Sequence, residues 1–371
     1  MKKNMIKLGD VATYINGYAF KPEDRGEVGL PIIRIQDLTG NAYDLGFYNG
    51  DYPKRIEIND GDVLISWSAS LGVYVWNRGR ALLNQHIFKV EFDKVNIDKS
   101  YFVYAVRQKL AEMAMKTHGA TMKHIVKKDF EETLIPYPSQ KKQIEIGTNL
   151  DKIANIIAAR KQQLELLDEL VKARFVEMFG DCNNLISMED VCSIITDGTH
   201  QPPKFKESGI PFILVSNLSN NTITYNTEKY ISEETYSALY KRTPIEIGDL
   251  LLSTVGSYGH PAVVTEDTRF LFQRHIAYLK PKREIVNSFY LHSALLAPDG
   301  QRQIEEKIKG IAQKTLNLSE IRKIMIPVPE IEEQNEFADF VKRIDKSKVA
   351  IQKSLDETQI LFDSLMQKYF G

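Results

Sequence analysis

The chain repeats itself once along its length, and this doubling limits the possible folds more than any other feature of the sequence. Five short phrases of the first half recur in the same order in the second half, at offsets that grow from 180 to 191 residues and then stay constant. The matched phrases are 29–35 with 209–215, 61–66 with 248–253, 86–87 with 275–276, 134–138 with 325–329, and 179–180 with 370–371. This pattern indicates a tandem duplication with loop insertions in the second globular part.

Each copy divides into a globular part and a long helix. We expect a globular domain at 1–140, a helix at 141–180, a second globular domain at 181–330 and a second helix at 331–371. Apolar runs between turn residues predict strands at 63–67, 86–92, 211–215 and 250–254, and helical apolar spacing predicts helices at 99–116 and 287–309. The expected fold class is α+β: two similar α/β domains joined by two long antiparallel coiled-coil helices, related by a pseudo-twofold internal repeat.

Both long helices carry a coiled-coil seam, in which eight of ten positions are apolar at alternating steps of four and three residues. The seam positions are Ile146, Leu150, Ile153, Ile157, Arg160, Leu164, Leu167, Val171, Arg174 and Met178 in the first helix, and Phe337, Val341, Ile344, Lys348, Ile351, Leu355, Thr358, Phe362, Leu365 and Tyr369 in the second. We expect the two seams to bury each other in antiparallel orientation. The alternative is an ordinary amphipathic helix packed on its own domain, but a helix about 38 residues long runs ~57 Å, longer than either globular part is wide.

The composition is that of a globular protein, with 43% hydrophobic and 26% charged residues. It contains no long apolar run and no secretory signal at the N-terminus, and its two cysteines, Cys182 and Cys192, are too few for a disulfide framework. We therefore expect a cytoplasmic protein that has no contact with a membrane. The formal net charge of −1 means that a nucleic-acid binder of this composition must gather its basic residues locally.

Motifs for catalysis are weak. The phrase Gln201-Pro202-Pro203-Lys204 lacks the first and last residues of an adenine methyltransferase motif, and no Walker loop is present. The nuclease-like half-motif Glu305-Glu306-Lys307 lies in a helical run of charges. His86 and His275 occupy matched places in strand-like segments, which favours satisfied histidines over metal ligands or bases. We predict no catalytic, cofactor-binding or metal-binding residue in this chain.

The remaining polar, basic and aromatic residues suit contact with nucleic acid. Lysines provide phosphate contacts, while hydroxyl, imidazole and aromatic side chains can reach the edges of bases. The candidate DNA-binding residues are Tyr18, Lys21, Ser68, Ser70, Lys123 and Lys127 in the first copy, and His200, Lys204, Thr254, Ser257, Tyr258 and Lys314 in the second.

The sequence resembles the specificity (S) subunits of Type I restriction–modification systems over essentially its whole length. The resemblance rests on KLGDVATYINGYAF followed by GLPIIRIQDL, on ITDGTHQPPKFKESGIPFILVSNL, on the doubled Gly-Asp phrase, and on the doubled IPYPSQKKQIEI and IPVPEIEEQNEF that lead into the long helices. One departure is Lys142 before Gln143, where the family usually has an acidic residue, as Glu333 stands before Gln334.

This resemblance implies a non-catalytic subunit that reads double-stranded DNA. Each globular part would be a target recognition domain, and the helices would be spacers on which two methyltransferase (M) subunits dock, with restriction (R) subunits added. The chain would need no cofactor, because S-adenosylmethionine, ATP and Mg²⁺ act on the partners. Different loops in the two halves imply an asymmetric, bipartite target. The alternatives are a self-contained DNA methyltransferase or nuclease with a degenerate motif, and a coiled-coil scaffold with no role at DNA.

Overall fold

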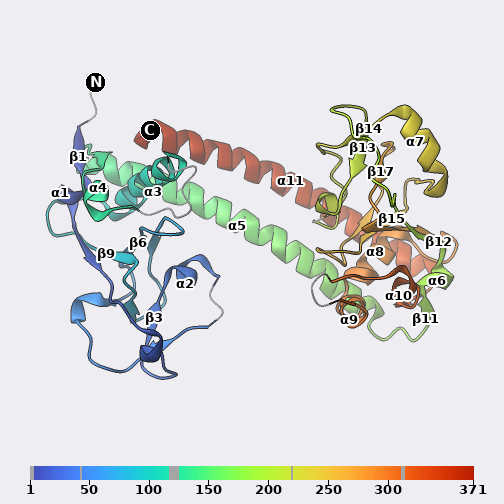
Figure 1. Ribbon diagram of the computed structural model, residues 1–371, viewed down its shortest axis with the longest axis horizontal. Helices are drawn as coiled ribbons and strands as arrows, with labels where there is room; N and C mark the ends of the chain where they lie inside the picture. The colour runs from blue at the N-terminus through green and yellow to red at the C-terminus, as the bar shows by residue number, and fades with distance from the viewer. Residues whose placement is uncertain (1–3, 42–43, 117–124, 219, 311–313) are drawn as a thin grey trace. The chain divides into compact units, whose positions relative to one another are not determined.

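The chain divides into two units, each of which contains one globular part together with stretches of both long helices (Figure 1). The structure, a computed structural model, describes residues 4–41, 44–116, 125–218, 220–310 and 314–371. Unit 1 consists of residues 1–160 and 354–371, and unit 2 consists of residues 161–353. Among the described residues, no helix combines the length and the apolar character needed to cross a membrane.

Unit 1 is built on two small sheets and a two-stranded ribbon. Its strands are β1 Met5–Lys7, β2 Thr13–Asn16, β3 Leu30–Ile33, β4 Phe47–Tyr48, β5 Glu57–Ile58, β6 Val63–Ser66, β7 Gly72–Val75, β8 Ala81–Leu83, β9 Ile87–Glu91 and β10 Leu134–Pro136. Its helices are α1 Leu8–Val11, η1 Pro22–Asp24, α2 Ile35–Thr39, η2 Lys54–Ile56, α3 Lys99–Lys116, α4 Lys127–Glu131 and the first part of α5 Gln140–Phe179. The sheets have the orders β2-β9-β6-β7 and β4-β3-β8-β5, and β1 pairs with β10.

Unit 2 repeats this topology strand for strand, except that it has no counterpart of β5 among its described residues. Its strands are β11 Leu185–Ser187, β12 Cys192–Asp197, β13 Ile210–Ile213, β14 Tyr230–Ile231, β15 Leu250–Ser253, β16 Pro261–Val263, β17 Leu271–Phe272, β18 Ile276–Pro281 and β19 Met325–Pro327. Its helices are α6 Met188–Val191, η3 Val215–Leu218, α7 Glu233–Leu239, η4 Tyr240–Arg242, α8 Ser288–Leu296, α9 Pro298–Glu306, α10 Leu318–Ile321 and the first part of α11 Ile331–Phe370. The orders are β12-β18-β15-β16 and β14-β13-β17, with β11 paired to β19.

The doubled Gly-Asp phrase forms the tight turn before one of the two inner strands of each larger sheet. Gly61 and Gly248 have φ angles of +90° and +91°, which glycine adopts without strain. The aspartate that follows accepts the backbone N–H three residues before it, from Asn59 in unit 1 and from Glu246 in unit 2. The repeated phrase is therefore a turn that starts β6 and β15.

A glutamine near the start of each long helix attaches that helix to its own globular part. Gln143 is buried, accepts the backbone N–H of Asp98 and donates to the carbonyl of Pro138. The matched Gln334 is also buried and accepts the N–H of Asn287 while donating to the carbonyl of Pro329. These bonds replace water on both ends of each buried amide, which explains why the two glutamines follow the I-P-x-P phrase at the same distance.

The matched Phe-Gly phrases end the long helices in the core of a unit. In unit 2, Phe179 packs edge-on against Tyr290 of α8, with ring centroids 4.9 Å apart. In unit 1, Phe370 at the end of α11 packs against Tyr101 of α3 at 5.1 Å. Each unit thus contains the start of one long helix and the end of the other. The two helices consequently run antiparallel.

Polar contacts fix the register of the helix pair inside each unit. In unit 1, the Arg160 guanidinium donates to the hydroxyl of Thr358 and, at 2.6 Å, to the carbonyl of Ser354. In unit 2, Lys348 forms an ion pair with Asp168 at 2.6 Å. The predicted antiparallel pairing of the seams is confirmed, and three of the four polar seam residues (Arg160, Thr358 and Lys348) take part in these contacts.

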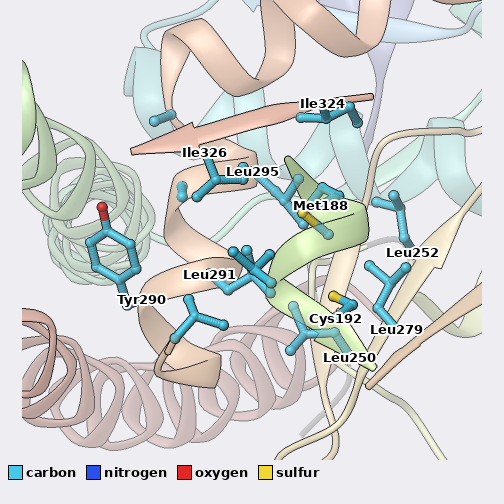
Figure 2. Close-up of a cluster of buried hydrophobic side chains, with 14 of the residues drawn as sticks. Met188, Cys192, Leu250, Leu252, Leu279, Tyr290, Leu291, Leu295, Ile324 and Ile326 are labelled. Carbon is cyan, nitrogen blue, oxygen red and sulfur yellow. The ribbon is translucent and has the colours of Figure 1, made fainter. Parts of the chain in front are cut away.

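A large apolar cluster in unit 2 joins the sheet to α6, α8 and the ribbon strand β19 (Figure 2). Figure 2 shows Met188 and Cys192 next to Leu291 of α8 and Leu250 of β15. Burial raises the pKa of the Cys192 thiol to about 12, so this cysteine remains an apolar core residue. The corresponding cluster of unit 1 includes Leu8, Val11, Val63, Tyr101, Ile146 and Phe370.

The structure confirms the expected fold class and corrects one helix. The segment 287–309, predicted as a single helix, is broken into α8 and α9 at Ala297, which is extended with ψ 155°. Pro298 explains the break, because proline disfavours a helical conformation of the residue before it and has no N–H to donate. The division of the chain into recognition domains and spacers stays a prediction, since the compact units cut both long helices.

Candidate nucleic-acid interface

In unit 1, three separate loops meet at one end of the larger sheet. Strands β2 and β6 run in the same direction on either side of β9, with Asn16 opposite Phe88 and Ser66 opposite Ile87. The chain that leaves β2, the chain that leaves β6 and the chain that enters β9 therefore lie together. A backbone bond of 3.0 Å from Gln85 to the carbonyl of Tyr18 joins two of these loops.

The predicted residues of unit 1 are distributed over these loops. Tyr18 is exposed and its ring contacts Phe20, which in turn contacts Tyr48, at centroid distances of 5.0 and 5.2 Å. Ser68 is half-buried and Ser70 exposed in the turn from β6 to β7, where the Ser70 carbonyl accepts the Ser66 hydroxyl.

The lysines of unit 1 differ in what they contact. Lys21 is exposed, and its ammonium lies 3.9 Å from Glu23. Lys127 instead donates to the carbonyl of Tyr14 at 2.8 Å and lies over the ring of Phe88, so it also supports the core. Lys123 lies outside the described residues.

Unit 2 brings the matching loops together in the same way. Asp197 at the end of β12 lies opposite Ala277, and Ser253 at the end of β15 lies opposite Ile276. Arg274 donates its backbone N–H to the carbonyl of Thr199 at 3.1 Å, and Thr254 donates to that of His275 at 2.9 Å. These loops enclose a polar pocket of about 300 Å³. It is lined by Asp197, Thr254, Val255, Arg274, His275, Thr315, Leu316, Asn317 and Leu318.

A second pocket, of about 520 Å³, lies over the loop after β12. It is lined by residues 198–204 together with Thr235, Ala238, Leu239, Arg242 and Thr243. His200 contacts Asp197 at 2.9 Å, and Arg242 pairs with the same carboxylate. Lys204 is exposed on the loop that lines this pocket, and among the described residues no carboxylate pairs with it. The pocket therefore combines apolar walls with cationic side chains.

Two predicted contact residues of unit 2 are already bound to an acidic side chain. Tyr258 donates to Glu305 at 2.7 Å, and Lys314 lies 3.2 Å from the same carboxylate. The hydrogen bond with Tyr258 and the hydrogen bond and charge of Glu305 raise the pKa of Lys314. In turn, hydrogen bonds from Tyr258 and Lys314 lower the pKa of Glu305. Ser257 is exposed, whereas Thr254 is only 5% exposed, so packing limits what the Thr254 side chain can reach.

A matched glycine brings the loops into close contact in each unit. A Cβ at Gly17 would lie 2.2 Å from the carbonyl oxygen of Asn84, and a Cβ at Gly198 would lie 2.3 Å from that of Phe272. No larger residue fits at either place without a shift of the backbone. The position of the loop after β2 or β12 is therefore fixed relative to the turn before β9 or β18.

Sequence reasoning missed the residues of that turn. Gln85 and Arg274 are exposed at this end of their sheets, each directly before one of the matched histidines. Burial and the neighbouring Arg274 lower the pKa of His275, so its ring is neutral at pH 7. The matched His86 and His275 were the available signal, because they marked a place that the duplication keeps. Among the described residues, no group of three or more metal-binding side chains comes together.

A family model and individual relatives of this chain point to the same protein family. The family model described as the Type I restriction modification DNA specificity domain matches residues 2–167 and again residues 184–359. The EcoBI specificity subunit of Type I restriction enzyme from Escherichia coli is 26% identical over 397 residues, covering 98% of this chain and 83% of that protein. The MjaVIII specificity subunit of Methanocaldococcus jannaschii is 22% identical over 367 residues, covering 92% and 85%.

Solved structures share the fold. The crystal structure of a Type I restriction–modification S subunit from M. genitalium matches with a TM-score of 0.60 and 14% identity, over 100% of this chain and 96% of that chain. A chain from a study of assembly and conformational transition in the type I system matches with a TM-score of 0.56 and 16% identity, over 99% and 97%.

Proposed function

Because the chain belongs to the Type I restriction–modification DNA specificity family, we propose that each half reads one part of an asymmetric, bipartite DNA target. The observation that carries this proposal is the matched convergence of loops at the same end of two equivalent sheets. The loops have the same framework but different side chains, with Tyr18 in one half and Thr199 and His200 in the other. Two similar frameworks with different surfaces suit two different half-sites.

The long helices are the proposed docking surface for the methyltransferase (M) subunits. Several large apolar side chains on their outer faces are exposed, including Ile156 and Ile360 in unit 1 and Leu166 and Val349 in unit 2. Leu170 and Leu361 are both exposed and lie 191 residues apart, at equivalent places of the repeat. Exposed apolar side chains on paired helices are typical of contact surfaces. A repeated surface suits two copies of one partner.

In this proposal the chain is a non-catalytic subunit that acts in the cytoplasm. S-adenosylmethionine serves the M subunits, and ATP and Mg²⁺ serve the restriction (R) subunits. The experiment that tests the function is methylome sequencing of cells that contain the chain together with its M partner. A bipartite methylated motif that disappears when the chain is deleted is the expected result, and an unchanged methylome would contradict the proposal.

The purified chain alone should neither methylate nor cleave DNA. The physical reason is that no nucleotide loop or methyltransferase motif is present in the sequence. The measurement is transfer of a labelled methyl group and nicking of plasmid DNA, with S-adenosylmethionine or with ATP and Mg²⁺. Adding the M partner is the positive control, and turnover by the chain without any partner would favour the self-contained enzyme instead.

Replacing Lys204 by alanine should weaken binding of all DNA sequences about equally. The slope of log K against log salt is negative, and one phosphate contact fewer makes it less steep by roughly 0.9. Lys314→Ala should have a smaller effect, because its ammonium must first leave Glu305. Lys127→Ala is the structural control, because it removes the bond to Tyr14 and so shows how the loss of an internal contact affects binding. A Lys204 variant with the slope of the parent would show that this lysine is merely solvated.

A further inference from the structure

The turn before strand β9 and the matching turn before β18 each hold one exposed polar side chain, Gln85 or Arg274, on a backbone that hydrogen bonds keep in place. The turns contain Asn84, Gln85 and His86 in unit 1, and Gln273, Arg274 and His275 in unit 2. Each turn closes on itself, with bonds of 3.2 Å from Ile87 to Asn84 and 3.1 Å from Ile276 to Gln273. Each is also tied to the loop after β2 or β12, by the bonds to Tyr18 and Thr199 described above. The backbone is therefore set before any ligand binds.

The side chain of the second residue in each turn forms a hydrogen bond with the histidine that follows it. The Gln85 amide nitrogen lies 3.2 Å from Nε2 of His86, and Nε of Arg274 donates to Nε2 of His275 at 3.3 Å. Both contacts use only part of the hydrogen-bonding capacity. Gln85 retains its amide oxygen and a second N–H, and Arg274 retains both Nη groups. Within the described residues, none of these atoms has a hydrogen-bond partner.

The remaining groups match the edges of two different bases. A glutamine amide bonds in bidentate fashion to N6 and N7 of adenine, and an arginine guanidinium bonds in the same way to O6 and N7 of guanine. A fixed backbone and a partly held side chain lower the entropy lost on binding. Both residues are exposed at the end of the sheet where the other candidate contacts lie.

We propose that Gln85 and Arg274 are matched specificity-determining residues, Gln85 contacting an adenine in one half-site and Arg274 contacting a guanine in the other. This inference rests on the proposed function. It goes further by assigning one base contact to the same structural position in each half. A phosphate contact by Arg274 is the main competing role, because it would add affinity without any preference for sequence.

The test uses the assembled complex of the chain with its M partner and the motif found by methylome sequencing. Duplexes carrying each single base-pair change in both half-sites compete for binding to the parent and to Arg274→Gln, Arg274→Ala and Gln85→Ala. The parent is expected to discriminate against a changed G·C pair in one half-site by roughly 5- to 150-fold. In both Arg274 variants the preference for this G·C pair is lost, while the preferences at all other positions are unchanged. Gln85→Ala should do the same at one A·T pair of the other half-site.

Arg302→Gln is the matched control, because Arg302 is an exposed arginine of unit 2 that pairs with Asp299 and Glu306 on α9. It should leave every position unchanged. The proposal fails if an Arg274 variant binds all duplexes more weakly by one common factor, if no position changes, or if the Gln85 and Arg274 variants act on the same half-site. Thermal unfolding is measured in parallel. Loss of folding in the Arg274 variants would also overturn the proposal, because it would show that Arg274 has a structural role. A parent complex without any bipartite motif would instead refute the proposed function.

Discussion

Removing one heptad from each long helix should shorten the unread spacer of the target and leave both half-site sequences as they are. The helices α5 and α11 each contain 40 residues, or ~60 Å at 1.5 Å per residue. This length corresponds to roughly 18 base pairs at about 3.4 Å each, so we expect the unread spacer between the half-sites to be shorter than that. One heptad is ~10.5 Å, so the expected change is about three base pairs.

The deletion is best made in both helices at once, because they pair in antiparallel register. Residues 161–167 and 349–355 each make up one heptad, and their loss preserves Arg160 and Thr358 on one side and Asp168 and Lys348 on the other. Assembly with the M partner is checked by gel filtration, and the methylome gives the spacer. Deletion of 161–167 alone is the control, since it shifts the register and should prevent assembly. Unchanged spacing in an assembled double deletion would show that the helices do not set the distance.

Replacing Phe179 by alanine should destabilise unit 2 by about 3–5 kcal/mol, the usual result of truncating a buried phenylalanine. Its ring is 3% exposed and contacts Tyr290, Phe175 and Phe337. Val176, one turn earlier on the same helix, is 48% exposed, so Val176→Ala is the matched control and should change stability by ~0.5 kcal/mol or less. Urea unfolding followed by near-UV circular dichroism measures both. Equal midpoints for the two variants would contradict the packing described for this helix end.

The periodic parts of the molecule were predictable from sequence. The seam from Ile146 to Met178 and its match from Phe337 to Tyr369 follow a repeat that is typical of paired helices, and the structure confirms the antiparallel pairing. The strands at 63–67, 86–92, 211–215 and 250–254 are present as β6, β9, β13 and β15, each with slightly different bounds. The break at Ala297 was not predicted because the apolar spacing continues through it, although Pro298 in the sequence is a signal for a helix boundary.

The candidate interface was predictable only in part, because tertiary contacts decide which side chains are available. Thr254 has the residue type of a base contact, but packing against the segment around Leu316 buries it. Lys127 and Lys314 look like phosphate contacts in sequence, yet each has partners inside the fold. In contrast, Gln85 and Arg274 are available for contact but were not predicted. They adjoin strand-like runs, and only the sheet topology shows that they lie at its open end.

The polar contact of Arg160 with Thr358 makes the two helices unequal partners. At the equivalent place of the repeat, 191 residues away, stand Ile351 and Leu167. Two separate copies of the first half that associated through the same geometry would therefore set Arg160 against Leu167, where no hydroxyl accepts a hydrogen bond from the guanidinium. Two copies of the second half would set Thr358 against Ile351. If the gene were divided into two, the mixed pair of fragments should reassemble in preference to either self-association.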